Sequence, residues 1–391
     1  MPARTILYPY EYGSMMGGSQ HSVLDLLARL DRTQYRAAVL CPPAGDFKLR
    51  AAERGAEVEL VGSGEAWVVD SRRPAVSIAT MVRVTHALAR AIRRCDAALT
   101  HANNIGAFLC SSMAAALIGR KIPVIWTDRG FGQYPPVLRR AVRALMRGPR
   151  NHLVATTAMC AALWTQEGVS GEKLRVIHNG IDTQKFFPRD AEAAKAQLGV
   201  APGTPTVGMV ARFSRYKGHD VLIKAVARLN RQIPNVKALI IGDIGWPADD
   251  RVYREDLKVL TKDLGLEHNI VWVGGVPNDR VADAIAACDV VVNPSPLEPF
   301  GRVIAEAMLV GRPVVATRAG GAPELIAEGA NGYLFEPGDS AELAARLETL
   351  LPDKAACIEM GQRAANDART RFDAAVTAAR YQELYARLLQ E

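Results

Sequence analysis

Short apolar runs alternate with amphipathic stretches along almost the whole chain. In the first half, runs at 5–8, 37–40, 57–61, 97–100, 124–127 and 153–156 predict strands, with a last strand at 175–178. Apolar residues at helical spacing predict helices between them, at 22–30, 81–94 and 106–117. Strands that alternate with helices form a parallel sheet covered by helices, so this half is predicted to be a Rossmann-like α/β domain.

A second series of the same kind begins after Gly199. Strands are predicted at 206–210, 237–241, 270–273, 290–293, 314–317 and 332–335, and helices at 219–232, 252–264, 281–287, 304–310 and 341–351. The turn-rich, polar stretch 179–188 between the two series has the composition of an interdomain hinge. We therefore expect two α/β domains, residues 1–182 and 183–371. Ligands bind at the carboxyl ends of the strands in such sheets, which predicts a cleft between the domains.

The bulk composition fits this organisation. With 391 residues, 49% hydrophobic and 23% charged, the chain has the size of two domains and the balance of a globular protein. The most apolar long window, 105–119, contains two serines and predicts a buried helix rather than a membrane span. Six cysteines are scattered without a CxxC pair or a metal-ligand spacing, which predicts reduced thiols in a cytoplasmic protein and no metal site.

Positive charge is concentrated in the first half of the chain. Residues 1–180 contain 23 Lys/Arg against 13 Asp/Glu, whereas residues 181–391 contain 25 against 28. Five arginines between Arg139 and Arg150 alternate with apolar residues and predict a cationic amphipathic helix. This segment could lie on an anionic membrane surface or meet an acidic ligand. The alternative is a solvated face whose arginine stems pack on the core. No aromatic-basic pattern or known motif points to nucleic acid.

Two carboxylates, Glu298 and Glu306, bracket the point where a strand turns into a helix. The predicted strand ends near Pro294, and the following helix is stopped by Gly311 and a nearby proline. Free N–H groups at such a helix start favour a phosphate. The carboxylates, roughly 10 Å apart, could each accept hydroxyl hydrogen bonds, an arrangement that suits a sugar nucleotide. The alternatives are an acid that stabilises the helix dipole and a solvated surface acid.

Two cations follow the first strand of the second series. Arg212 and Lys217 lie between that strand and the next helix, where a guanidinium and an ammonium group suit a diphosphate. The loop lacks the GxxxxGK[ST] pattern of a nucleotide triphosphatase, and no GxGxxG follows a strand, which disfavours a hydride-transferring enzyme. The alternative is that both side chains are simply solvated. Because Arg212 and Lys217 share the carboxyl edge of the sheet with Glu298, we favour phosphate binding.

The first half offers weaker candidates. Gly17 and Gly18 follow the first strand and precede a helix, so the backbone there could come close to a ligand; a plain flexible loop is the alternative. His101 ends the fourth strand and is either catalytic or structural. Asp128 and Arg129 hold the same place one strand later and could equally form an internal salt bridge.

Taken together, these segments resemble the retaining glycosyltransferases of the group 1 family (family 4), which have the GT-B fold. The likeness covers most of the chain, and the Arg…Lys-Gly and Glu-x7-Glu elements, in this order, are its most specific part. The matching residues are Gly17-Gly18-Ser19, His101 with Asn103, the run 177–182, Arg212 with Lys217-Gly218, Glu298-Pro299-Phe300-Gly301, Glu306-Ala307-Met308 and the run 320–324. Many members have His where Arg129 stands, which leaves acceptor-side roles for Asp128 and Arg129 open.

The resemblance implies roles for these residues. Arg212 and Lys217 would hold the donor's diphosphate, and Glu298 the donor-sugar hydroxyls. Glu306 would hold the ribose, and His101 would contact the donor sugar or orient the acceptor. The backbone would supply the rest of the site, through Gly17 and Gly18 at the distal phosphate, Phe300 and Gly301 beside the sugar, and Arg302, Val303 and Ile304 at a phosphate. The last helix, 372–389, would cross back onto the first domain.

The reaction implied is transfer of a hexosyl or related unit, with retention, from a nucleoside-diphosphate sugar to a hydroxyl acceptor, in glycan, lipopolysaccharide or glycolipid assembly. Positioning and charge stabilisation of the leaving diphosphate would carry it, without a bound metal or a tightly bound cofactor. The basic first half favours an anionic or lipid-linked acceptor, on a cytoplasmic enzyme that could be peripheral on the membrane. Alternatives are a GT-B sugar-nucleotide epimerase, a phosphorylase and a non-catalytic sugar-nucleotide-binding protein.

Overall fold

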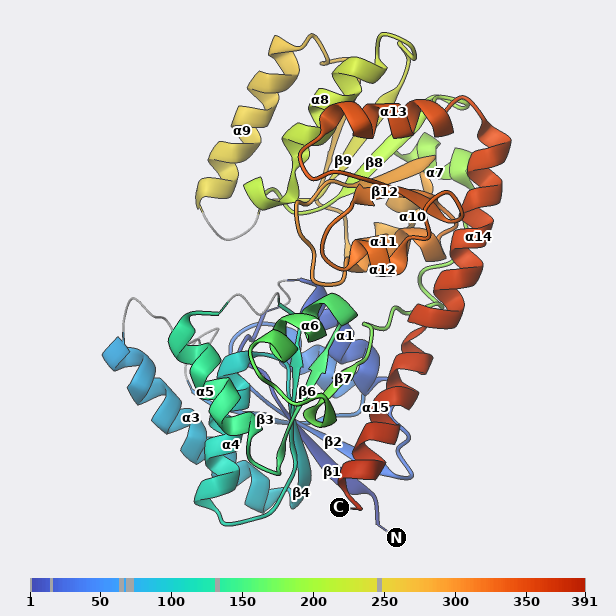
Figure 1. The fold of residues 1–391 in the computed structure, drawn as a ribbon. Helices are drawn as coiled ribbons and strands as arrows, with labels where there is room; N and C mark the ends of the chain where they lie inside the picture. The colour runs from blue at the N-terminus through green and yellow to red at the C-terminus, as the bar shows by residue number, and fades with distance from the viewer. Residues whose placement is uncertain are drawn as a thin grey trace. The chain divides into compact units, whose positions relative to one another are not determined.

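A computed structural model describes residues 2–14, 17–62, 67, 74–130, 134–244 and 248–390. The chain divides into two compact units, Met1–Gly180 with Ala374–Glu391, and Ile181–Asp373. Each unit is built on a parallel sheet with helices on both faces (Figure 1). The predicted architecture of two Rossmann-like parallel-sheet domains is therefore confirmed.

The sheet of the first unit has, in the described residues, the strand order β3-β2-β1-β4-β5-β6-β7, with every pair parallel. The order reverses beside β1, between β1 and β4, which is where ligands bind in open α/β sheets. Its strands are β1 (Arg4–Pro9), β2 (Tyr35–Cys41), β3 (Glu57–Leu60), β4 (Ala97–Ala102), β5 (Val124–Asp128), β6 (Asn151–Ala155) and β7 (Leu174–Val176). Its helices are α1 (Gly18–Leu27), α2 (Phe47–Glu53), α3 (Pro74–Arg94), α4 (Ile105–Leu117), α5 (Pro136–Met146), α6 (Ala158–Gln166) and α15 (Ala374–Leu388).

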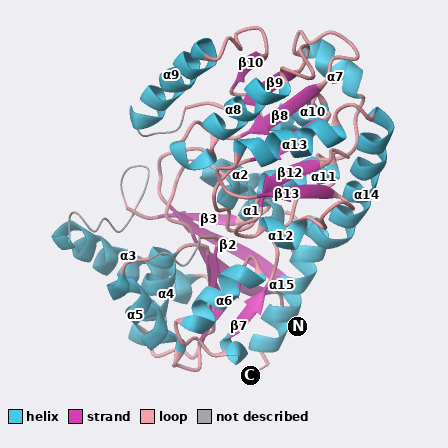
Figure 2. Cartoon of the chain, turned by 45° about the horizontal axis from the view of Figure 1, so that its top comes forward, coloured by secondary structure: helices cyan, strands magenta, loops and turns pink. Residues whose placement is uncertain are grey.

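The second sheet repeats this plan in the described residues, with the order β10-β9-β8-β11-β12-β13. Figure 2 labels its strands β8, β9, β10, β12 and β13. The strands of this sheet are β8 (Thr206–Val210), β9 (Lys237–Ile241), β10 (Ile270–Gly274), β11 (Val290–Asn293), β12 (Val314–Thr317) and β13 (Gly332–Phe335). Strands β8, β9, β11 and β12 are almost fully buried Val- or Ile-rich runs, as expected where helices cover both faces. The helices are α7 (Ala191–Gln197), α8 (His219–Leu229), α9 (Ala248–Asp263), α10 (Val281–Ala286), α11 (Arg302–Leu309), α12 (Ala322–Leu325), α13 (Ser340–Leu350) and α14 (Lys354–Phe372).

The prediction of a last helix at 372–389 is wrong about the residue at which that helix begins. Phe372 ends α14, and α15 begins at Ala374 after a break at Asp373, whose backbone is extended. The Ile181 N–H donates to the Phe372 carbonyl (2.8 Å) within the second unit. In the first unit, a Cβ on Gly180 would lie 2.6 Å from the Ala374 Cα, so only glycine fits where the chain passes this closely.

Helix α15 belongs to the core of the first unit. Tyr381, Leu384 and Tyr385 are buried in one cluster with residues of β1 and β2. The chain end therefore completes the first domain, as expected for a C-terminal helix that returns to it.

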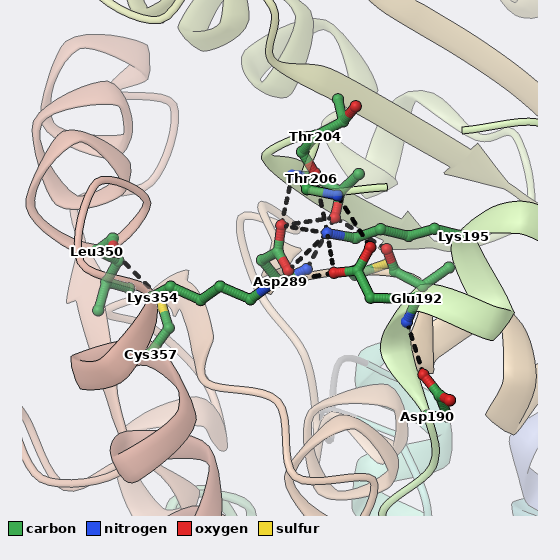
Figure 3. Close-up of polar contacts among 12 residues, drawn as sticks. Asp190, Glu192, Lys195, Thr204, Thr206, Asp289, Leu350, Lys354 and Cys357 are labelled. Atoms are coloured by element: carbon green, nitrogen blue, oxygen red, sulfur yellow. Dashed lines mark hydrogen bonds and ion pairs between the residues drawn. The ribbon is translucent and has the colours of Figure 1, made fainter. Parts of the chain in front are cut away.

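A buried ion pair fixes the amino-terminal edge of the second sheet. The Lys195 ammonium on α7 lies 2.9 Å from both carboxylate oxygens of Asp289 and donates to the Thr204 carbonyl (2.9 Å) (Figure 3). Asp289, just ahead of β11, also accepts from the Thr206 N–H (2.8 Å) at the start of β8. The Lys195 side chain is 1% exposed. This network therefore ties α7 to two central strands at the end of the sheet opposite to the carboxyl edge.

Candidate active site

Three neighbouring strands of the second unit bring most of the predicted residues together. β8, β11 and β12 are adjacent and parallel, so the loops that follow them leave the sheet at the same edge. Arg212 and Lys217 follow β8, and Glu298 follows β11. Glu306 lies on α11, the helix that comes next.

The loop after β8 is pressed against the loop after β11. Gly218 has a left-handed backbone (φ +74°), and a Cβ there would lie 2.4 Å from the Pro294 carbonyl oxygen. Glycine is required on both counts. The short 3-10 helix η2 (Arg215–Lys217) precedes this contact, so the contact sets the position of Lys217.

Lys217 and Glu298 form an ion pair at this edge. The Ser295 hydroxyl donates to the same carboxylate oxygen, Glu298 Oε1, over 2.8 Å. The lysine side chain is 25% exposed and the glutamate side chain 14%, so the pair is accessible but partly shielded from water. The structure thus brings together the predicted diphosphate cation and the predicted sugar-binding carboxylate.

A glycine turn after β12 holds the backbone of Glu298. Gly320 is left-handed (φ +64°), and a Cβ there would lie 2.2 Å from the Glu298 carbonyl oxygen. The N–H of Gly321 donates to that same oxygen (2.8 Å). Gly320 and Gly321, which belong to the run 320–324 that carries the resemblance, therefore position the backbone of Glu298.

Arg212 differs from Lys217 in its surroundings. Its side chain is exposed, and none of the described residues forms an ion pair or side-chain hydrogen bond with it. Its main chain is fixed, because the neighbouring Ala211 and Phe213 donate to the Ile241 and Asp243 carbonyls (2.9 and 3.0 Å). The guanidinium thus stands on a fixed loop with its donors open to an incoming anion.

The start of α11 combines a backbone donor with a charged pair. Gly301 is left-handed (φ +87°) and caps the helix without a side-chain contact. The Ile304 N–H donates to the Gly301 carbonyl (2.9 Å), so it is already used; within the described residues, the N–H of Val303 meets no acceptor. The phosphate-binding role of the amides at Arg302, Val303 and Ile304 stays a prediction. Phe300 is buried, with its ring against Phe372 (centroids 5.5 Å apart).

Glu306 is not a solvated surface acid. It is 7% exposed, and Arg302 on the preceding turn donates from Nε to its Oε1 (2.8 Å). That alternative from the sequence is wrong, because a carboxylate buried this far needs specific partners. The Arg302 side chain was not predicted; its i, i+4 spacing to Glu306 was the available signal.

His101 lies inside the first unit rather than at its surface. It is fully buried within β4, with Nδ1 2.6 Å from the Tyr385 hydroxyl and Nε2 2.7 Å from the Thr127 hydroxyl. Burial lowers its pKa to about 3, and Arg129 nearby acts in the same direction, so the ring is neutral. A role of His101 in contacting the donor sugar or orienting the acceptor stays a prediction. Its observed role is to anchor α15 to the sheet.

Asp128 and Arg129 do not form the salt bridge considered as an alternative in the sequence. Asp128 is buried and accepts from the Trp164 indole (2.6 Å) and the Tyr134 hydroxyl (2.9 Å); burial raises the pKa of its carboxyl group. Arg129 instead donates to the side-chain oxygens of Asn103 (3.0 Å) and Asn179. A guanidinium oriented by two amides therefore marks the carboxyl end of β5.

The first unit contains two further candidates from the sequence, Gly17 and Gly18, and another buried acid, Glu11. Gly17 and Gly18 are exposed at the start of α1, and a Cβ on Gly17 would touch nothing within 4 Å. Glu11, which the sequence did not single out, lies buried just beyond β1, and burial raises its pKa to about 8. Of the loop before Gly17, Met15 and Met16 lie outside the described residues.

Comparisons with known proteins agree with this arrangement. A family model described as glycosyl transferases group 1 matches residues 190–370, and a model of glycosyltransferase family 4 matches residues 16–185. The chain belongs to the group 1 glycosyltransferases. Its GT-B fold is shared with Anabaena HepE, solved with UDP and glucose, at a TM-score of 0.82 and 28% identity over 97% of this chain and 99% of that one.

Curated relatives of this group 1 glycosyltransferase have two different names. A D-inositol 3-phosphate glycosyltransferase of Nocardia farcinica is 33% identical over 258 residues, 66% of this chain and 57% of the relative. An N-acetyl-alpha-D-glucosaminyl L-malate synthase of Bacillus anthracis is 28% identical over 72% of each chain. The matched region thus spans little more than half the length of the first of these relatives. Among the described residues, no helix is both long and apolar enough to cross a bilayer.

Proposed function

We propose that this chain transfers a sugar, with retention, from a nucleoside-diphosphate donor to a hydroxyl acceptor in glycan, lipopolysaccharide or glycolipid assembly. The observation that carries the proposal is the convergence of Lys217, Glu298 and Ser295 at the edge that also bears Arg212. Cations beside a carboxylate match a diphosphate joined to a hydroxyl-bearing ring. UDP is the donor nucleotide proposed first, because HepE, at 28% identity, was solved with UDP-glucose.

In the proposed reaction the protein contributes positioning and charge. Arg212 and Lys217 face the negative charge that develops on the leaving diphosphate, the place where a preorganised cation lowers the barrier most. Glu298 holds the sugar, and Glu306 the ribose. The departing diphosphate oxygen takes the proton of the acceptor hydroxyl on the same face. Two cations supply the compensating charge, which supports chemistry that needs no bound metal.

The test is release of nucleoside diphosphate from a panel of UDP-, GDP-, ADP- and TDP-sugars, with and without acceptor. We expect slow hydrolysis of one donor without acceptor, and none in Glu298→Ala. Inversion of the anomeric configuration in the product, read by NMR, would contradict retention. A dependence on inorganic phosphate would favour a phosphorylase, a product epimeric at C2 an epimerase, and nucleotide-sugar binding without turnover a non-catalytic protein.

The acceptor is proposed to be anionic. Two relatives are named for inositol 3-phosphate and L-malate, both of which carry negative charge. In this chain the Arg129 guanidinium, oriented by Asn103 and Asn179 at the carboxyl end of β5, supports recognition of such a group. The excess of Lys and Arg over acids in residues 1–180 supports it as well.

Contact with an anionic membrane is proposed through the exposed side of α5. Val142 and Met146 lie in the core while Val137 at the helix start is exposed, so the helix presents one apolar side chain outward and no continuous apolar face. Arg140 and Arg147 remain exposed, which supports a purely electrostatic contact on a cytoplasmic protein. We expect binding to vesicles containing phosphatidylglycerol, weakened about 10-fold or more in Arg140→Gln/Arg147→Gln. Equal sedimentation of both proteins would contradict this contact.

A further inference from the structure

The side chains around Glu298 meet at one of its two oxygens. Lys217 Nζ and Ser295 Oγ both contact Oε1. Among the described residues, none donates to Oε2. The carboxylate is thus anchored by one oxygen and presents the other. Lys217, which anchors this oxygen, is also the cation proposed to bind the diphosphate.

Lys217 has to divide one positive charge between two anions when both are present. Its ammonium has three donors on a flexible stem and behaves as a point charge, which pairs with whichever anion is nearer. In the structure that anion is Glu298. A bound diphosphate therefore has to draw Lys217 away from Oε1 or share it.

We propose that Glu298 is an internal counter-ion of Lys217 that competes with the diphosphate and so limits the affinity for the nucleotide product. The inference rests on the proposed function and deepens it. While a sugar is present, its hydroxyls give Glu298 other partners and Lys217 turns to the diphosphate. Once the sugar has left, Glu298 competes for Lys217 again, and release of the nucleoside diphosphate becomes easier. The residue that binds the donor sugar therefore also weakens binding of the nucleoside diphosphate product.

The test is a double-mutant cycle on UDP binding by isothermal titration calorimetry, with wild type, Glu298→Gln, Lys217→Ala and the double variant. Glutamine keeps the shape of the side chain and removes its charge. We expect Glu298→Gln to bind UDP about 5- to 10-fold more tightly than wild type, a typical coupling between two competing contacts. In the Lys217→Ala background the same change should alter the affinity less than twofold, because the cation for which the anions compete is gone.

Uridine, which lacks the diphosphate, is the matched ligand, and its affinity should be the same in all four proteins. Unchanged or weaker UDP binding by Glu298→Gln would overturn the counter-ion role. An equal gain in both backgrounds would do so too, since it would show simple repulsion between Glu298 and phosphate. Either result leaves the proposed function standing, because wild type still binds UDP. If wild type binds none of UDP, GDP, ADP and TDP, the proposed function and this inference both fall.

Discussion

Lys217→Ala is expected to lower the turnover of the donor sugar by about 10²-fold or more. The ammonium lies at the carboxyl edge of the second sheet, on a loop that Gly218 fixes against the Pro294 carbonyl. A charge held in advance where a leaving group becomes negative needs little reorganisation during the reaction, so its loss raises the barrier directly. The effect should appear mainly in kcat, because the diphosphate gains negative charge between the bound donor and the transition state.

Lys224→Ala is the matched control for this variant. Lys224 lies one turn into α8 after Lys217, and its exposed ammonium pairs with Asp220 (2.8 Å). Loss of such a surface pair should change neither stability nor turnover measurably. Steady-state release of UDP, with circular dichroism to confirm the fold, makes the comparison. Turnover within a factor of a few of wild type in folded Lys217→Ala would remove this residue from the proposed mechanism.

The sequence predicted the bounds of the strands more closely in the second unit than in the first, for a physical reason. Strands β8, β9, β11 and β12 are short Val- or Ile-rich runs covered on both faces, and they lie at the residues predicted, as does β13. Helices α2, α6, α7, α12 and α14 were missed; all but the 19-residue α14 span nine residues or fewer, and α6 is apolar nearly all round. So short a segment shows too few turns for a helical period to stand out.

The candidate site, like the fold, could be predicted only in part from the sequence. The order of strands places the loops after β8 and β11 at one edge, so the neighbourhood of Lys217 and Glu298 could be inferred from the sequence. Their direct pairing, and the part that Ser295 plays, depend on side-chain directions that no pattern contains. The complete burial of His101 could not be predicted, because its strand continues to Ala102 and because Tyr385, which contacts it, comes 284 positions later.

Lys195→Met is expected to reduce the free energy of unfolding of the second unit by about 3–5 kcal/mol. The change leaves Asp289 without its cation at the amino-terminal edge of the sheet, and the lysine it removes is 1% exposed (Figure 3). Removing one partner of a buried pair is costly because the remaining charge stays desolvated. Thr206 would still donate to Asp289, but hydrogen bonds from neutral groups do not cancel a full charge.

Lys195→Met combined with Asp289→Asn tests this reason for the loss. The double variant has no uncompensated charge and keeps an oxygen that can accept from Thr206, so it should be more stable than Lys195→Met alone. Lys354→Met is the control, because its ammonium is exposed and pairs with Glu192 over 3.1 Å, a contact that should contribute less than about 1 kcal/mol. Urea denaturation together with hydrogen exchange at β8 and β11 assigns each change to this unit. A double variant as unstable as Lys195→Met would show that the destabilisation comes from lost packing of the lysine stem and not from the unpaired carboxylate of Asp289.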